Sequence, residues 1–146
     1  MKEFKGRVLC AGTYKGECIV SHGGLNTLAT FQSSAIKGAK KVIASDQNNP
    51  DLFGKNLTGI ALCLPQTIGS TTGGMVLQVI CSMKINPACM LFSESIDSLA
   101  AAGAVLANVW EHSEMIVIDR LGKEFLEVAK SGGQVEVKED GTVIVY

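Results

Sequence analysis

Hydrophobic residues follow two different spacings along the chain, and each spacing predicts a different kind of element. Three apolar runs have the length of buried strands: residues 57–65, 88–92 and 115–119. Between the first two runs, five apolar residues recur at helical spacing: Met75, Val76, Val79, Ile80 and Met83. This spacing predicts a helix with its apolar face in the core, and the alanine-rich residues 96–107 predict a second helix. Strands that alternate with helices favour parallel pairing.

The two ends of the chain predict hairpins. Residues 6–12 and 17–21 have strand character around a Tyr14-Lys15-Gly16 turn, which predicts an N-terminal hairpin. Residues 134–138 and 142–146 alternate between apolar and polar on either side of an Asp-Gly pair. Because Asp-Gly favours the tight turns of hairpins, we expect a C-terminal hairpin there.

The segment between the N-terminal hairpin and the first long apolar run has a weaker pattern. Residues 23–41 contain Gly, Ser, Thr and Asn without a clear period, so we expect a functional loop with at most one short helical turn. Residues 41–45 predict a further strand. The sequence has no internal repeat and no linker, and it therefore predicts one α/β domain over residues 1–146.

Composition narrows the class of protein. The chain has 146 residues, of which 47% are hydrophobic and 18% charged, and this balance supports one sizeable core. A formal charge of -1 argues against a nucleic-acid partner and against a polybasic membrane surface. The N-terminus lacks the apolar stretch of a signal peptide, and no run approaches the roughly 18–20 apolar residues of a membrane span. We therefore expect a cytoplasmic protein.

The five cysteines do not form a pattern typical of disulfides or metal sites. Their number is odd and no two of them make a C-x-x-C pair. Four lie inside apolar runs, where a thiol behaves as a small hydrophobic group. These are Cys10, Cys63, Cys81 and Cys89. We expect reduced, buried thiols, with neither a metal nor a cofactor bound by this chain.

The most informative stretch is residues 65–74, which leave a buried strand and enter a helix. Ser70 follows Gly69 and lies near the start of that helix. Backbone N–H groups at a helix N-terminus have no partner within the helix, so they attract anions. Simple N-capping by Ser70 or Thr71 is the alternative explanation. The stretch lacks the lysine of a phosphate-binding loop and the G-x-S-x-G pattern of a hydrolase.

Several short segments, in this order and spacing, resemble the small subunit of aconitase X. They are Asp46-x-x-Asn49-Pro50, Gly54-Lys55-x-Leu57-x-Gly59-Ile60-x-Leu62-x-x-Pro65, Gly69-Ser70, Asn86-Pro87-Ala88 and Gly103-Ala104-Val105-Leu106-Ala107. The resemblance extends from about Lys5 to Ile118. It implies a swivelling β/β/α domain with a mixed sheet or barrel-like core.

The same resemblance implies a partner and a reaction. In the family, the small subunit closes on a large subunit that holds an iron–sulfur cluster, and the pair acts as a hydro-lyase on a small hydroxy acid. The family reactions are dehydration of mevalonate 5-phosphate and of cis-3-hydroxy-L-proline. We accordingly expect a heteromeric dehydratase whose small subunit is inactive alone.

Roles for individual residues follow from the resemblance. The family serine at the strand-to-helix turn acts as the catalytic base and falls on Ser70. The substrate-binding residues expected beside it are Gly69, Thr71, Thr72 and Gly73, together with Gly23, Gly24 and Asn26 in the earlier loop. His22 precedes these glycines, either as a proton-transfer group or as a surface turn residue.

Two positions depart from the family pattern. Ile68 replaces an arginine, which removes a cation suited to gripping phosphate or carboxylate, and Asn49 replaces a histidine. The missing arginine makes cis-3-hydroxy-L-proline the preferred substrate. The alternatives are the small subunit of a mevalonate 5-phosphate dehydratase, or a non-catalytic module that binds a protein or an anion with the same fold.

Overall fold

Parallel strands form the centre of the molecule in the computed structural model, which describes residues 1–68, 73–96, 98–110 and 114–146. The strands are β3 (Tyr14–Val20), β5 (Ala61–Leu64), β7 (Cys89–Phe92) and β8 (Ile116–Asp119), paired side by side in that order. Every residue of β5, β7 and β8 is buried. Such unbroken burial is expected when both faces of a parallel sheet are covered, and the predicted parallel pairing is confirmed.

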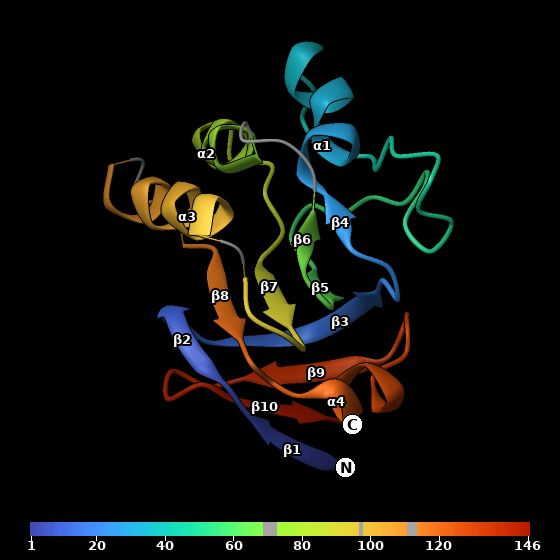
Figure 1. Ribbon diagram of the computed structural model, residues 1–146, viewed down its shortest axis with the longest axis vertical. Coiled ribbons are helices and arrows are strands. Elements are labelled where there is room, and N and C mark those ends of the chain that lie inside the picture. Colours follow the sequence, from blue (N-terminus) through green and yellow to red (C-terminus); the bar gives the residue numbers. More distant parts are fainter. Residues whose placement is uncertain (69–72, 97, 111–113) are drawn as a thin grey trace.

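Antiparallel strands extend this sheet at both ends. On one side β3 pairs with β9 (Gln134–Val137), which pairs with β10 (Thr142–Val145) and then β1 (Lys2–Lys5). On the other side β8 pairs with β2 (Arg7–Cys10). Within the described residues the sheet has eight strands in the order β1-β10-β9-β3-β5-β7-β8-β2 (Figure 1).

The sheet is a nearly closed barrel because its two edge strands are consecutive in the chain. Only Gly6 separates β1 at one edge from β2 at the other. A Cβ atom on Gly6 would lie 2.4 Å from the carbonyl oxygen of Asp119, so a larger residue does not fit there. The Gly6 N–H donates a hydrogen bond to the Gly141 carbonyl, 3.1 Å away, across the closure. The expected mixed, barrel-like sheet is therefore confirmed.

Helices cover the outer face of the parallel strands. In Figure 1, α1 (Thr27–Ile36), α2 (Gly73–Ser82) and α3 (Ser98–Trp110) lie together above the sheet, and α4 (Lys123–Val128) lies apart from them. Leu62 and Leu64 of β5 belong to the core beneath the three helices. Ala61 and Cys63 point to the second core, enclosed with the antiparallel strands. No helix in the described ranges is both long and apolar enough to cross a membrane.

The predicted N-terminal hairpin is wrong, whereas the C-terminal hairpin is confirmed. β2 pairs with β8, and β3 pairs with β9 and β5, so the two N-terminal strands lie in different parts of the sheet. The residues interpreted as a turn, Tyr14 to Gly16, lie inside β3. Pairing with distant strands overrides a weak local turn pattern, but the Asp-Gly turn does connect β9 to β10.

The middle of the chain holds two further corrections. Residues 23–41 contain α1, a ten-residue helix, because the core face of α1 carries small polar residues that hide the helical period. These buried residues are Thr27, Thr30 and Ser34. The strand predicted at residues 41–45 reduces to one bridge between Ile43 and Asn56. The helices predicted at 75–83 and 96–107 are confirmed as α2 and α3.

The buried carboxylate of Asp119 links the strands at the point where the barrel closes. Asp119 is fully buried and accepts hydrogen bonds from Nε and Nη2 of Arg7 at 2.9 and 2.7 Å. It also accepts one from the Ile96 backbone N–H at 3.0 Å. Asp119 thus joins edge strand β2, the end of β8 and the chain leading into α3.

Replacing this carboxylate will weaken the fold. We expect Asp119→Ala to lower the free energy of unfolding by about 1–3 kcal/mol, because the buried Ile96 N–H loses its acceptor. Urea unfolding followed by circular dichroism measures the loss, with the exposed Glu139→Ala as the matched control. Equal midpoints for the two variants would contradict a bracing role.

Candidate active site

A short parallel pair joins the two segments that the sequence predicts for the site. β4 (Leu25–Asn26) follows the loop after β3, and β6 (Thr67–Ile68) follows β5. The two pair in parallel with Asn26 opposite Ile68, and the Leu25 N–H donates to the Gln66 carbonyl at 2.8 Å. The structure therefore brings the Gly23–Asn26 segment beside the chain that leads to Ser70.

Four predicted residues lie outside the described residues: Gly69, Ser70, Thr71 and Thr72. Gly73, predicted to bind substrate, is the first residue of α2. α2 therefore begins within three residues of Ser70, as the strand-to-helix interpretation requires. The roles of these five residues stay predictions.

Gly24 lies directly under Ile68. A Cβ atom on Gly24 would lie 2.7 Å from Cγ2 of Ile68, which is closer than two non-bonded carbon atoms approach in proteins. The Ile68 side chain is 50% exposed, so it covers the glycine with one side and faces solvent with the other. At the position where the resemblance predicts an arginine, this chain thus has an apolar side chain beside the Gly23-Gly24 loop.

Asn49, the second departure, supports the same loop from below. Its Nδ2 donates a hydrogen bond of 2.9 Å to Oγ of Ser21, and that hydroxyl donates to the Gly23 carbonyl at 2.8 Å. Asn49 and Ser21 are both buried. A neutral amide at position 49 therefore holds the loop through a hydroxyl relay without adding a charge beneath the site.

A contact between a histidine and an aspartate at the surface fixes the start of the loop. The His22 backbone N–H donates to Oδ2 of Asp51 at 2.8 Å, and Nδ1 of His22 lies 3.2 Å from the same oxygen. The backbone hydrogen bond is the main cause that lowers the pKa of the Asp51 carboxyl. His22 is exposed, which agrees with the surface-turn alternative. The sequence alone gave no indication of Asp51 as its partner.

Asn26 already has a structural task. Its side-chain oxygen accepts a hydrogen bond of 3.0 Å from the Ala29 N–H, so Asn26 is the N-cap of α1. Its predicted contact with substrate stays a prediction. Its place opposite Ile68 nevertheless puts it at the same edge as the other candidates.

The cysteines do not fit an iron–sulfur cluster. All five are free and buried, and they divide between the two cores on opposite faces of the sheet. Burial raises the pKa of Cys89 to about 12, and the hydrogen bond with Cys18 together with burial raises that of Cys63. Thiolates, which bind metals, are disfavoured at both positions. Among the described residues, no group of three His, Cys, Asp or Glu side chains is placed to hold a metal ion.

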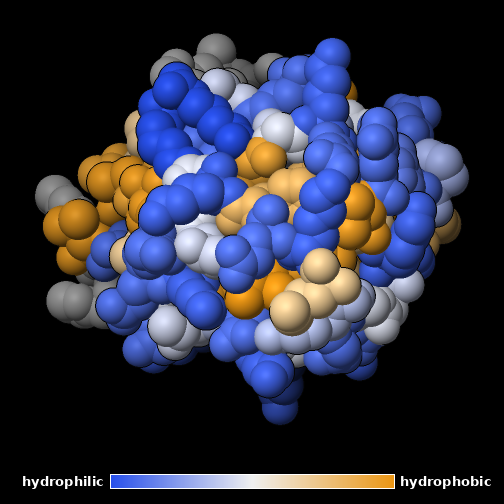
Figure 2. Space-filling view, turned by 90° about the horizontal axis from the view of Figure 1, so that it is seen from below, coloured by the Kyte–Doolittle hydropathy of each residue, from blue (hydrophilic) through white to orange (hydrophobic). Residues whose placement is uncertain are grey.

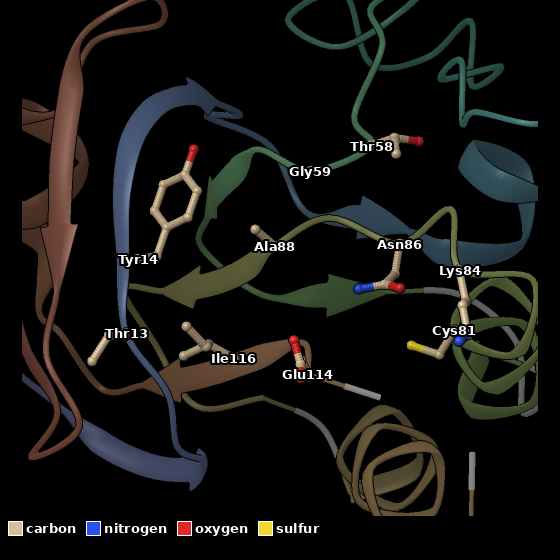
Figure 3. Close-up of a pocket in the computed structure, with 10 residues that line it drawn as sticks. All are labelled: Thr13, Tyr14, Thr58, Gly59, Cys81, Lys84, Asn86, Ala88, Glu114 and Ile116. Carbon is tan, nitrogen blue, oxygen red and sulfur yellow. The ribbon is translucent and has the colours of Figure 1, made fainter. Parts of the chain in front are cut away.

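A cavity opens at the opposite edge of the parallel strands. It has a volume of about 510 Å³ and lies at the amino ends of β5, β7 and β8. In Figure 3, the side chains of Cys81, Asn86 and Glu114 point toward its interior. None of the predicted site residues lines it. Because ligands of open parallel sheets bind at the carboxyl ends of the strands, the β4–β6 edge is the better candidate site.

Comparison with known proteins identifies relatives over nearly the whole chain. The aconitase X swivel domain model matches residues 3–146. The phosphomevalonate dehydratase small subunit of Methanocella arvoryzae is 29% identical over 140 residues, covering 96% of this chain and 94% of that protein. The protein of the same name from Methanosarcina mazei is 27% identical over 135 residues, covering 92% and 84%. The crystal structure of holo aconitase X from Thermococcus kodakaraensis has a TM-score of 0.82 at 23% identity, covering 100% and 99%, and shows the shared fold.

Adjacent glycines in the loop allow a matched test of its geometry. We expect Gly24→Ala to lower the free energy of unfolding by about 1 kcal/mol, because the new methyl group overlaps Ile68. Gly23→Ala is the control, since nothing lies within 4 Å of a Cβ atom there. Thermal unfolding compares the two variants, and Ile68→Ala should restore the stability of Gly24→Ala. A Gly23→Ala loss as large as that of Gly24→Ala would contradict the contact.

Proposed function

The chain belongs to the aconitase X swivel domain family, and we propose that it acts as the small subunit of an aconitase X-type dehydratase. The β4–β6 pair is the structural observation that carries this proposal. It places the Gly23-Gly24 loop beside the segment that contains the family serine, two parts of the chain more than 40 residues apart in sequence. Two relatives named as dehydratase small subunits align over 96% and 92% of the chain.

The proposed enzyme needs a large subunit. The described residues of this chain offer no ligand set for an iron–sulfur cluster, so we assign any such cluster to the large subunit. The candidate site also lies at an open edge of the domain, with Ile68 half-exposed. A partner that covers this edge would exclude water and strengthen electrostatic interactions inside the site.

We assign Ser70 the role of general base. Dehydration takes a proton from one carbon and a hydroxyl group from its neighbour. Ser70, in its deprotonated form, accepts the proton, and the C–H electron pair becomes the new C=C bond. The C–O bond breaks with its electron pair on oxygen, and the departing hydroxide takes a proton from solvent and leaves as water. The N–H groups in the first turn of a helix have no partner within the helix, so the start of α2 at Gly73 favours an anion near its N-terminus.

For the substrate we propose mevalonate 5-phosphate. The curated relatives carry the name phosphomevalonate dehydratase small subunit, and this favours the phosphorylated substrate over cis-3-hydroxy-L-proline. The second candidate, cis-3-hydroxy-L-proline, is favoured by one observation. Ile68 puts an apolar, half-exposed side chain where the family arginine would supply a permanent positive charge.

Removing the hydroxyl of Ser70 will greatly lower turnover without preventing assembly with the large subunit. We expect Ser70→Ala, co-expressed with the large subunit, to lower kcat by roughly 10²–10⁴-fold, the usual contribution of a general base. Ser82→Ala, at the far end of α2, is the matched control. Turnover is followed by release of the dehydrated product, and assembly by gel filtration. Unchanged kcat in an assembled Ser70→Ala complex would remove Ser70 from the mechanism.

The substrate preference is tested by the charge at position 68. We expect the wild-type complex to have a higher kcat/KM for mevalonate 5-phosphate than for cis-3-hydroxy-L-proline. We expect Ile68→Arg to lower the KM for mevalonate 5-phosphate by about tenfold, because the arginine adds a charged hydrogen bond to the phosphate. Ile68→Met, apolar and of similar volume, is the control. Unphosphorylated mevalonate should respond to neither change. A higher kcat/KM for cis-3-hydroxy-L-proline would instead establish the second candidate.

A further inference from the structure

An apolar groove lies open between two helices of the outer layer. It has a volume of about 320 Å³ and lies between α1 and α2; we call it the α1–α2 groove. Its lining residues are Gln32, Ala35, Ile36, Met75, Val76 and Val79. Ile36 is 74% exposed, Met75 62% and Val79 41%. Met75 and Val79 were expected in the core from their spacing, so this groove is also where that expectation is wrong.

A second groove, lined by three lysines, lies beside the C-terminal end of α1. It has a volume of about 790 Å³, and three of its lining residues are Lys37, Lys40 and Lys41; we call it the lysine groove. The half-exposed side chain of Phe53 also lines it. The last turn of α1 therefore forms a ridge, with Ile36 facing the apolar groove and Lys37 facing the basic one.

None of the described residues that line the lysine groove is an aspartate or a glutamate. No aspartate or glutamate occurs between residues 18 and 45 of the sequence. Within the described parts of the chain, none of the three lysines makes an ion pair. The formal charge of the whole chain is nevertheless -1, so this concentration of cations is local. A surface with unpaired cations is complementary to a partner surface with carboxylates.

The opposite face of the molecule differs in character. Seen from below, it is mostly hydrophilic, with several hydrophobic areas between the hydrophilic side chains (Figure 2). The α1–α2 groove has large exposed side chains and lies on the two helices that begin at candidate site residues, since Asn26 caps α1 and Gly73 is the first residue of α2. A protein seated in the groove would thus lie next to the edge that the reaction needs covered.

We infer that the large subunit docks on α1 and α2, placing an apolar segment in the α1–α2 groove and carboxylates opposite the lysine groove. This inference rests on the proposed function, because it takes the large subunit as the occupant. Burial of Ile36, Met75 and Val79 supplies the affinity. The lysines steer and orient the encounter, which makes association faster at low ionic strength.

The test measures binding of the purified chain to the purified large subunit by surface plasmon resonance. We expect Ile36→Glu and Val79→Glu each to raise Kd by roughly 30-fold or more, as at buried interface centres. The double variant Lys40→Glu, Lys41→Glu should lower the association rate and reduce its dependence on salt. Because all four side chains are exposed, these variants should fold, and their thermal unfolding midpoints check this.

Matched controls carry the same charge changes elsewhere. Gln134→Glu on β9 adds one negative charge, and Lys123→Glu with Lys138→Glu reverses two, all at exposed positions. These controls should bind like the wild type. If the wild type binds and is active but Ile36→Glu and Val79→Glu bind equally well, the docking surface is overturned while the proposed function stands. If the wild type fails to bind any large subunit, the proposed function fails as well.

A second copy of the chain is the competing occupant. Light scattering of the isolated wild type is expected to show a monomer at the concentrations used for binding. A dimer that Ile36→Glu dissociates, with unchanged affinity for the large subunit, would assign the groove to self-association and overturn the inference.

Discussion

The rest of the structure depends on the closure of the sheet at Gly6. Two strands that follow one another in the chain lie at opposite ends of the strand order, so one residue must turn the backbone from one edge to the other. Only a glycine allows the Asp119 carbonyl to approach that closely. The Arg7–Asp119 pair lies next to this turn and ties β2 to β8. The curvature that closes the barrel then separates two cores, one enclosed by strands and one beneath the helices.

The sheet also determines where the candidate site lies. The four parallel strands end at a common edge, so the loops after β3 and β5 emerge side by side, and a two-residue parallel pair is enough to join them. Asn49 and Asp51 reach the same loop from a distant segment and hold it by hydrogen bonds to Ser21 and His22. The position of the Gly23-Gly24 loop is therefore set by the sheet and by two polar side chains.

Sequence patterns predicted the elements whose evidence is local. The buried runs, α2 and the Asp-Gly hairpin each carry their own period or turn, and each forms as expected. The predicted N-terminal hairpin is wrong because β2 and β3 pair with strands far away in the sequence, β2 with β8 and β3 with β9 and β5, which no local pattern encodes. α1 was missed because buried Thr30 and Ser34 make its inner face look polar. For the candidate site, the resemblance predicted the segments, and their roles stay predictions, whereas the support from Asp51 and the contact of Ile68 with Gly24 required the fold.

The side chain at position 68 has two roles, which the sequence alone does not separate. The side chain there must cover Gly24, whose missing Cβ leaves room for it, and it must also face the open edge of the site. Isoleucine satisfies the first constraint with its branched methyl group. An arginine could satisfy it with its aliphatic stem while its guanidinium extends to solvent or substrate. The loop geometry is therefore compatible with either residue, so an exchange at this position changes the charge offered to a substrate while the β4–β6 pair keeps its register.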